Sequence, residues 1–203
     1  MDLCTALRIQ ARANRLANHR LHAATAALAR EDFHAPRTSY FPSLAKTLNH
    51  ILAVDAYYIG ALHGHSDLPA KYDAFAPADD LPALAERQRA SDERLIAFCD
   101  RLDAAGCNAE VAMDRGNGKI QRDLAGHVLA HLFMHQTHHR GQAHAMLAGT
   151  TVKPPQLDEF LMPSDAPWRA ADMSALGWDE AVVYVEGRPP CTTPPPDGSV
   201  LAP

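Results

Sequence analysis

The distribution of proline divides this chain into two parts. None of its 15 prolines lies between residues 83 and 153, whereas ten of them lie after residue 153. A proline inside a helix removes a backbone hydrogen bond and clashes with the preceding turn, so long helices fit only the proline-free stretch. The sequence therefore predicts a folded domain over residues 1–150 and an extended, partly disordered, Pro-rich C-terminal tail over residues 151–203.

The residue composition of the chain favours helices over a large sheet. It contains 37 Ala and 22 Leu against 13 Ile plus Val, and the first two residue types prefer helices while the last two prefer strands. Apolar residues at helical spacing predict four segments before residue 150: about Leu3 to Arg30, Leu44 to about Leu62, a cap at Asp79-Asp80 to about Leu102, and Arg122 or Asp123 to about Ala148. Four amphipathic helices joined by moderate loops predict an all-α fold, a four-helix bundle.

A short segment between the third and fourth helices has the pattern of a turn. Gly116, Asn117 and Gly118 stand between two short runs of mixed polarity. Such a turn suits a small β-hairpin, and a plain loop fits the segment nearly as well.

Charge and segment composition exclude several classes of function. The net charge of −5 argues against a protein held to nucleic acid by phosphate contacts and against a basic membrane-surface helix. No apolar run approaches the roughly 18 residues that span a bilayer, and no signal peptide is visible at the first residues. None of the four cysteines forms a C-x-x-C pair. We therefore expect a cytoplasmic protein with no nucleic-acid or membrane partner.

Histidine is the unusual residue of this sequence. It occurs 12 times, and six of these residues fall between His127 and His144. His135 and His139 stand four residues apart, so they share one face of a helix, as two imidazoles that bind one ion require. His50 takes an inward position on the second helix. Three inward histidines on two helices would supply a three-nitrogen metal site with an open position.

Two other interpretations of the same histidines compete with this site. His131 and His135 have the same spacing, with His127 one turn earlier, and helical i+4 steps drift by roughly 40°, so all four residues of that row cannot face inward equally. An imidazole pair can also be an ordinary packed or surface pair. One familiar motif is excluded, because the H-E-x-x-H metalloproteases need a glutamate base where this chain has Gln136.

Two motifs taken together resemble the DinB family, also described as DinB/YfiT-like metalloenzymes. They are the run Leu48-Asn-His-Ile-Leu52 and the run His135-Gln-Thr-His-His-Arg-Gly-Gln142, and the resemblance covers about residues 1–150. It implies a bundle of up-down-down-up type and frequent homodimers. It also implies a divalent metal ion such as zinc, nickel or iron, with His50, His135 and His139 as the metal ligands.

The resemblance leaves several functions open. Relatives of this family include metal-dependent thiol transferases and maleylpyruvate isomerases that use a low-molecular-weight thiol, which implies such a thiol and a small-molecule substrate for this chain. The alternatives are a metal-dependent hydrolase and a non-catalytic metal-binding or stress-related bundle. Arg140 is a candidate for binding an anionic substrate or thiol cofactor, and Asn49 and Gln142 are candidates for orienting the imidazoles. No catalytic residue is identified from the sequence.

Overall fold

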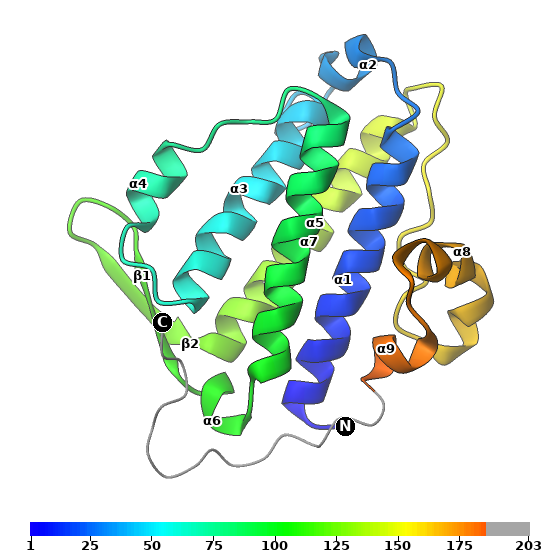
Figure 1. The fold of residues 1–203 in the computed structure, drawn as a ribbon. Helices are drawn as coiled ribbons and strands as arrows, with labels where there is room; N and C mark the ends of the chain where they lie inside the picture. The colour runs from blue at the N-terminus through cyan, green and yellow to red at the C-terminus, as the bar shows by residue number, and fades with distance from the viewer. Residues whose placement is uncertain (186–203) are drawn as a thin grey trace.

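Four helices of 19 to 23 residues form the frame of the molecule in a computed structural model, which describes residues 1–185 (Figure 1). They are α1 (Leu3–Thr25), α3 (Leu44–Leu62), α5 (Leu81–Arg101) and α7 (Ala125–Leu147). The predicted all-α class is confirmed, since the only sheet among the described residues has two strands. Within residues 1–185, none of the helices combines the length and apolar character needed to cross a membrane.

The directions of the four long helices match the predicted up-down-down-up arrangement. Figure 1 shows α1 and α7 running one way while α3 and α5 run the other. α1 packs against α5 and α7, and α3 packs against α7 and α5. The packing of α3 on α7 brings the histidines of these two helices to one side of the bundle. Three shorter helices precede the sheet: α2 (Arg30–His34), α4 (Leu68–Asp73) and α6 (Ala104–Cys107).

Side-chain caps mark the starts of α3 and α5. Ser43 accepts a hydrogen bond from the Lys46 amide at the start of α3, and Asp80 accepts one from the Ala83 amide at the start of α5. Pro82 lies in the first turn of α5, where its missing N–H costs nothing. The predicted first helix was too long, because α1 ends at Thr25, whose hydroxyl donates to the carbonyl of His22.

The segment around Gly116 forms the β-hairpin. β1 (Glu110–Asp114) pairs antiparallel with β2 (Ile120–Leu124), and the turn residues Gly116, Asn117 and Gly118 all have positive φ, which favours Gly and Asn. α7 therefore starts at Ala125, two or three residues later than predicted, because Arg122 to Leu124 pair with β1.

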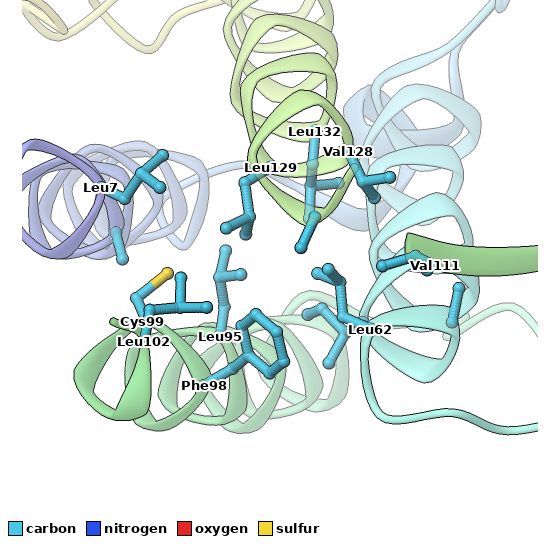
Figure 2. Packing of buried hydrophobic residues seen from close by; sticks show 14 of the residues in the cluster. Leu7, Leu62, Leu95, Phe98, Cys99, Leu102, Val111, Val128, Leu129 and Leu132 are labelled. Carbon is cyan, nitrogen blue, oxygen red and sulfur yellow. The ribbon is translucent and has the colours of Figure 1, made fainter. Parts of the chain in front are cut away.

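The core fills the space between the four long helices. Figure 2 shows Leu95 and Phe98 of α5 facing Leu129 and Leu132 of α7, with Val111 of β1 at one side. A second buried cluster fills the other end of the bundle. Burying side chains of this size stabilises the fold by about 1.5–3 kcal/mol each, and both clusters include residues of α3 and α7, whose packing they stabilise.

Much of the stretch from residue 151 to residue 185 is helical where the sequence predicted an extended chain. α8 (Ala166–Leu176) and α9 (Glu180–Tyr184) follow a short 3-10 turn (Pro163–Asp165) and contact α1. Pro163 and Pro167 lie in the first turns of the 3-10 turn and of α8, where proline is tolerated. The remaining prolines after Arg188 lie outside the described residues.

An apolar cluster and an arginine attach this segment to the bundle. Phe160, Met173 and Val183 pack on the α1 stripe around Leu16. Arg20 of α1 forms ion pairs of 2.7 Å with Glu159 and with Asp172, so both apolar and charged contacts hold the segment in place.

Candidate metal centre

Three histidines from two helices converge at one place in the structure. His50 lies on α3, and His135 and His139 lie one turn apart on α7. Their candidate ligand nitrogens all lie within 4.8 Å of one another, and the Nε2 atoms of His50 and His135 are 3.1 Å apart. The structure therefore brings together the three residues that the sequence singled out.

Aromatic packing holds the imidazoles in this arrangement. The ring of Phe41, just before α3, lies 4.2 Å from the ring of His50 and 5.5 Å from that of His139, measured between centroids. His139 is buried, and the other two histidines are half-buried. The cluster is thus covered on one side by an apolar side chain, which reduces its access to water.

The environment keeps all three imidazoles neutral at physiological pH. Burial and, to a smaller extent, the adjacent His139 together lower the pKa of His50 to about 4. Burial and the same neighbour lower the pKa of His135 to about 3. The pKa of His139 is also lowered, mainly by burial. Neutral imidazoles have a free nitrogen lone pair, which is the form that binds a metal ion.

A glutamine fixes the orientation of one ligand candidate. Nδ1 of His139 donates to the side-chain oxygen of Gln142 over 2.8 Å, which leaves Nε2 of His139 with its lone pair available. The Gln142 amide nitrogen in turn lies 3.2 Å from Nε2 of His138. This is the orienting contact that the sequence proposed for Gln142, of the kind usual around metal-binding histidines. Nδ1 of His135 is buried and has no hydrogen-bond partner among the described residues.

Asn49 was a candidate for orienting the imidazoles, but its side chain binds backbone groups instead. Its amide nitrogen donates to the carbonyls of Ala45 and Ala78, and its oxygen accepts from the Ala78 amide over 2.7 Å. Asn49 therefore ties the chain before α5 to α3 and leaves the imidazoles to other contacts.

The rival histidines lie outside the cluster. His131 is exposed, and its ring lies 5.1 Å from that of Tyr58 and 6.4 Å from that of His135. His127 is exposed as well. Within residues 1–185, the group of His50, His135 and His139 is the one set of three or more potential ligands arranged to share an ion.

The geometry and the donor set fit a divalent metal ion. Ligand nitrogens at 2.0–2.1 Å around a tetrahedral zinc ion are separated by about 3.3 Å, close to the 3.1 Å between His50 and His135. The widest separation of up to 4.8 Å would have to close by a small side-chain movement. Imidazole ligands suit zinc, nickel and iron without discriminating sharply among them.

Two pockets flank the histidines. The first, which we call the hairpin pocket, has a volume of about 530 Å³, and the second, the aromatic pocket, has a volume of about 490 Å³. Tyr72 lines both. The lining of the hairpin pocket includes Tyr57, Tyr58, Asp73, Asp114, Arg115, His131 and His135. The lining of the aromatic pocket includes His34, Phe41, Lys46, His50, Phe75, Pro77 and Asp79.

Comparison with known proteins decides the family. The sequence profile described as "DinB family" matches residues 6–170. This chain belongs to the DinB family. The match extends 20 residues past the boundary that the sequence predicted at residue 150 and includes the start of α8. A curated relative, Protein DinB of Bacillus subtilis (strain 168), is 26% identical over 129 residues, which cover 59% of this chain and 72% of the relative.

In this DinB family chain, Arg140 points away from the histidines and toward α1. Its guanidinium donates to the side-chain oxygens of Asn14 and Asn18, and only 6% of the residue is exposed. Burial lowers the pKa of Arg140 to about 10, while the charges of Asp92 and Asp55 oppose that shift, so Arg140 remains a cation. Arg140 also lines a third pocket, of about 420 Å³, between α1, α7 and the C-terminal segment. Its assignment to a substrate or cofactor stays a prediction.

A buried polar network joins the helices behind the histidine cluster. Gln136, the residue after His135, donates to Asp55 over 2.7 Å, and Gln88 donates to the other oxygen of Asp55 over 2.7 Å. Gln88 also donates to Asp92 over 3.1 Å. Burial raises the pKa of Asp55 to about 6 and that of Asp92 to about 7, the latter also because of the nearby Asp55 charge.

Replacing Asp92 with asparagine should change how stability depends on pH. The folded protein holds the Asp92 proton up to about pH 7, whereas an unfolded aspartate releases it near pH 4. Folding therefore retains a proton on Asp92 between these values, so the contribution of Asp92 to stability increases as pH falls from about 8 to 5. Between pH 8 and pH 5, we expect the free energy of unfolding of the wild type to increase relative to that of the Asp92→Asn variant by on the order of 2 kcal/mol, measured by urea unfolding. The exposed Asp158→Asn change is the matched control, and an equal pH dependence in wild type and Asp92→Asn would contradict the role of burial.

Sequence reasoning missed two residues beside the cluster. Phe41 comes from the loop before α3, where no periodicity indicates its direction. Arg115 comes from the hairpin turn, and its guanidinium lies over the rings of Tyr57 and Tyr58. The turn signal at Gly116 located the hairpin, but only the packing of β1 against α3 and α7 places Arg115 in a pocket with His135.

Proposed function

We propose that this DinB family protein is a metal-dependent thiol transferase or isomerase that works with a low-molecular-weight thiol. The observation that carries the proposal is the convergence of three neutral imidazoles between two pockets. Neither feature alone would point to this reaction class, because many buried histidines bind nothing and many pockets are inert.

The donor set favours an anionic sulfur ligand. His50, His135 and His139 would hold a divalent zinc, nickel or iron ion, which when bound supplies Lewis acidity that lowers the pKa of a thiol at the open position. The three protein ligands are uncharged, so they do not offset the charge of a divalent cation. An anion is therefore favoured as the next ligand, and thiolate sulfur is one that zinc and iron accept well.

The two pockets provide room for two reactants. His135 lines the hairpin pocket and His50 lines the aromatic pocket. Because the nitrogens of these two residues lie 3.1 Å apart, a thiol in one pocket and its acceptor in the other would meet beside the cluster. Holding two reactants side by side is itself a large source of rate enhancement.

The surroundings of the cluster favour transfer over hydrolysis by a metalloprotease mechanism. Gln136 follows His135 at the position where such enzymes need a general base, and its amide faces the buried Asp55. An amide cannot take up a proton. The residues of the chain would thus orient the imidazoles through Gln142, cover them with Phe41 and bind the two reactants.

A thiol-transfer screen with metal-loaded and metal-stripped protein tests the proposal. We expect stoichiometric metal by elemental analysis, and conjugation of glutathione to an aromatic electrophile such as chlorodinitrobenzene that is lost on stripping. The His127→Ala variant is the control, because it removes an exposed histidine from the same helix. Metal-dependent ester hydrolysis without a thiol would favour the hydrolase, and bound metal without turnover of any kind would favour the non-catalytic protein. The homodimer implied by the family stays part of this proposal.

A further inference from the structure

We propose that Arg115 binds a carboxylate of the thiol, so that the hairpin pocket selects carboxylate-bearing thiols. This inference rests on the proposed function, whose site it shares, and it names the substrate class of that site. The acceptor would then occupy the aromatic pocket. Three properties of Arg115 support this role: the way its guanidinium is held, its lack of an acidic partner among the described residues, and its contrast with the other cation beside the cluster.

The guanidinium of Arg115 is held in a defined position. Its central carbon lies 5.1 Å from the ring centre of Tyr57 and 5.3 Å from that of Tyr58. One terminal nitrogen donates to the Tyr58 hydroxyl over 3.2 Å, and Nε donates to Gln121 over 3.1 Å. A guanidinium that is already ordered loses little conformational freedom when it binds a carboxylate, and its planar fork matches the two carboxylate oxygens.

The hairpin that carries Arg115 is itself anchored to the bundle. The Tyr57 hydroxyl donates to the backbone carbonyl of Asp114 over 2.6 Å, and Val111 and Met113 of β1 are buried in the core. Arg115 is thus presented from a rigid element, at the end of β1 and beside the pocket that His135 lines.

In the described part of the chain, no acidic partner of Arg115 would compete with a ligand. Within residues 1–185, no carboxylate lies at ion-pair distance from Arg115. Its neighbour Asp114 uses a carboxylate oxygen to accept from the Gly116 amide over 2.8 Å. By contrast, Arg122 on the other strand of the hairpin pairs with Glu110 over 2.8 Å. Of these two hairpin arginines, Arg115 is therefore the one available to an anion.

Two carboxylates in the same pocket wall limit the charge attraction. Asp114 is engaged by the turn, and Asp73 is exposed at the end of α4. Their charges disfavour an anion at longer range, and a divalent ion at the histidines would offset them. We therefore expect carboxylate binding to be tighter in the metal-loaded protein than in the stripped protein.

Lys46 is the rival cation beside the cluster. It lines the aromatic pocket and, like Arg115, is exposed and has no ion pair among residues 1–185. An exposed ammonium on a flexible chain is strongly hydrated, and it offers no planar fork to a carboxylate. Phe41, Phe75 and Pro77 make the rest of that pocket largely apolar, which suits an apolar or aromatic acceptor.

Calorimetric titration with three probes tests the inference without relying on turnover. Glutathione carries a thiol and two carboxylates, its diethyl ester lacks the carboxylates, and S-methylglutathione retains the carboxylates but cannot form a thiolate. We expect Arg115→Gln to weaken glutathione binding to the zinc-loaded protein by about 10- to 100-fold, the loss of one charge-assisted contact. The same variant should leave the weaker binding of the diester unchanged. Tyr58→Phe, which removes a contact of Arg115, should show a smaller loss.

Matched variants separate the possible outcomes. Arg122→Gln removes the same charge from the same hairpin outside the pocket and should bind glutathione like wild type, and unchanged circular dichroism and zinc content verify that each variant is folded. A loss in Lys46→Gln with none in Arg115→Gln would overturn the inference by placing the anion in the aromatic pocket. Arg115-dependent binding of S-methylglutathione, with no added affinity from the free thiol, would support the anion site and count against thiol chemistry. If glutathione and its diethyl ester bind equally well in wild type and Arg115→Gln, thiol binding would be supported and the anion site at Arg115 would be contradicted.

Discussion

The His135→Ala variant is expected to lose its metal ion while keeping its helices. His135 contributes one of three nitrogens, and its Nε2 lies 3.1 Å from that of His50, so two ligands cannot replace the full set. Because altering only an outer partner of a metal ligand costs 10- to 100-fold in affinity, loss of a ligand itself should cost more than about 100-fold. Elemental analysis after gel filtration measures the metal content directly.

The fold should tolerate this substitution. Alanine has the highest helix propensity, His135 is only half-buried, and its Nδ1 makes no hydrogen bond to the described residues that could be lost. A helical circular-dichroism spectrum like that of wild type is therefore expected. His127→Ala is the control on the same helix and should retain the metal. Full metal content in His135→Ala, together with loss in His131→Ala, would move the site to the earlier histidines of α7.

Removal of the metal should lower the melting temperature at about pH 7.5. A ligand that binds only the folded state stabilises it by about 2.7–4.1 kcal/mol when its free concentration is 100 to 1,000 times its dissociation constant. For a chain of 203 residues, this corresponds to a decrease of roughly 5–15 °C on stripping. Calorimetric scans of protein loaded with zinc and of protein stripped and dialysed beforehand measure the difference.

The difference in melting temperature between zinc-loaded and stripped protein should disappear in acid. The pKa values of the histidines explain why. Folding lowers the pKa of His50 to about 4 and of His135 to about 3, whereas the unfolded chain takes up these protons near pH 6.5. Metal-free protein therefore loses stability as pH falls from about 6.5 toward 4. Near pH 4, protons also compete with the metal at the folded site. The zinc-dependent increase in melting temperature should thus shrink as pH falls through about 4 and then about 3, the pKa values of His50 and His135 in the folded protein.

His135→Ala serves as the control for the pH series, since its melting temperature should not respond to zinc at any pH. A wild-type sample that contains zinc at neutral pH, yet melts at the same temperature after stripping, would show that the ion contributes nothing to the fold. The histidines would then be ordinary packed residues, and the proposed function would lose its main support.

Local signals in the sequence predicted the long helices well because their causes are local. Ser43 and Asp80 cap the starts of α3 and α5 with their own side chains, and the absence of proline from residue 83 to residue 153 permits both α5 and α7. The Gly-Asn-Gly turn indicated the hairpin, because positive φ is a property of single residues. Residues 163–176 and 180–184 are helical where an extended chain was predicted, because Pro163 and Pro167 lie at helix starts and these helices form against α1.

Helical periodicity predicted the part of the candidate site that lies on a single helix. The spacing of His135 and His139 places them on one face of α7 whatever surrounds that helix. The pairing of that face with His50 was inferred from apolar stripes and from resemblance to the family, and it depends on the packing of α3 against α7. Periodicity alone left His127 and His131 as alternatives, since they repeat the same spacing on the same helix.

The sequence by itself determined where the four long helices lie, which faces they bury and which histidines are one turn apart, because backbone hydrogen bonding and side-chain spacing act over a few residues. Only the tertiary structure decided that Phe41 covers the cluster, that Arg140 turns toward Asn14 and that Arg115 faces a pocket beside His135. These placements join residues far apart in the chain, and they depend on how helices and hairpin pack side chains into shared space.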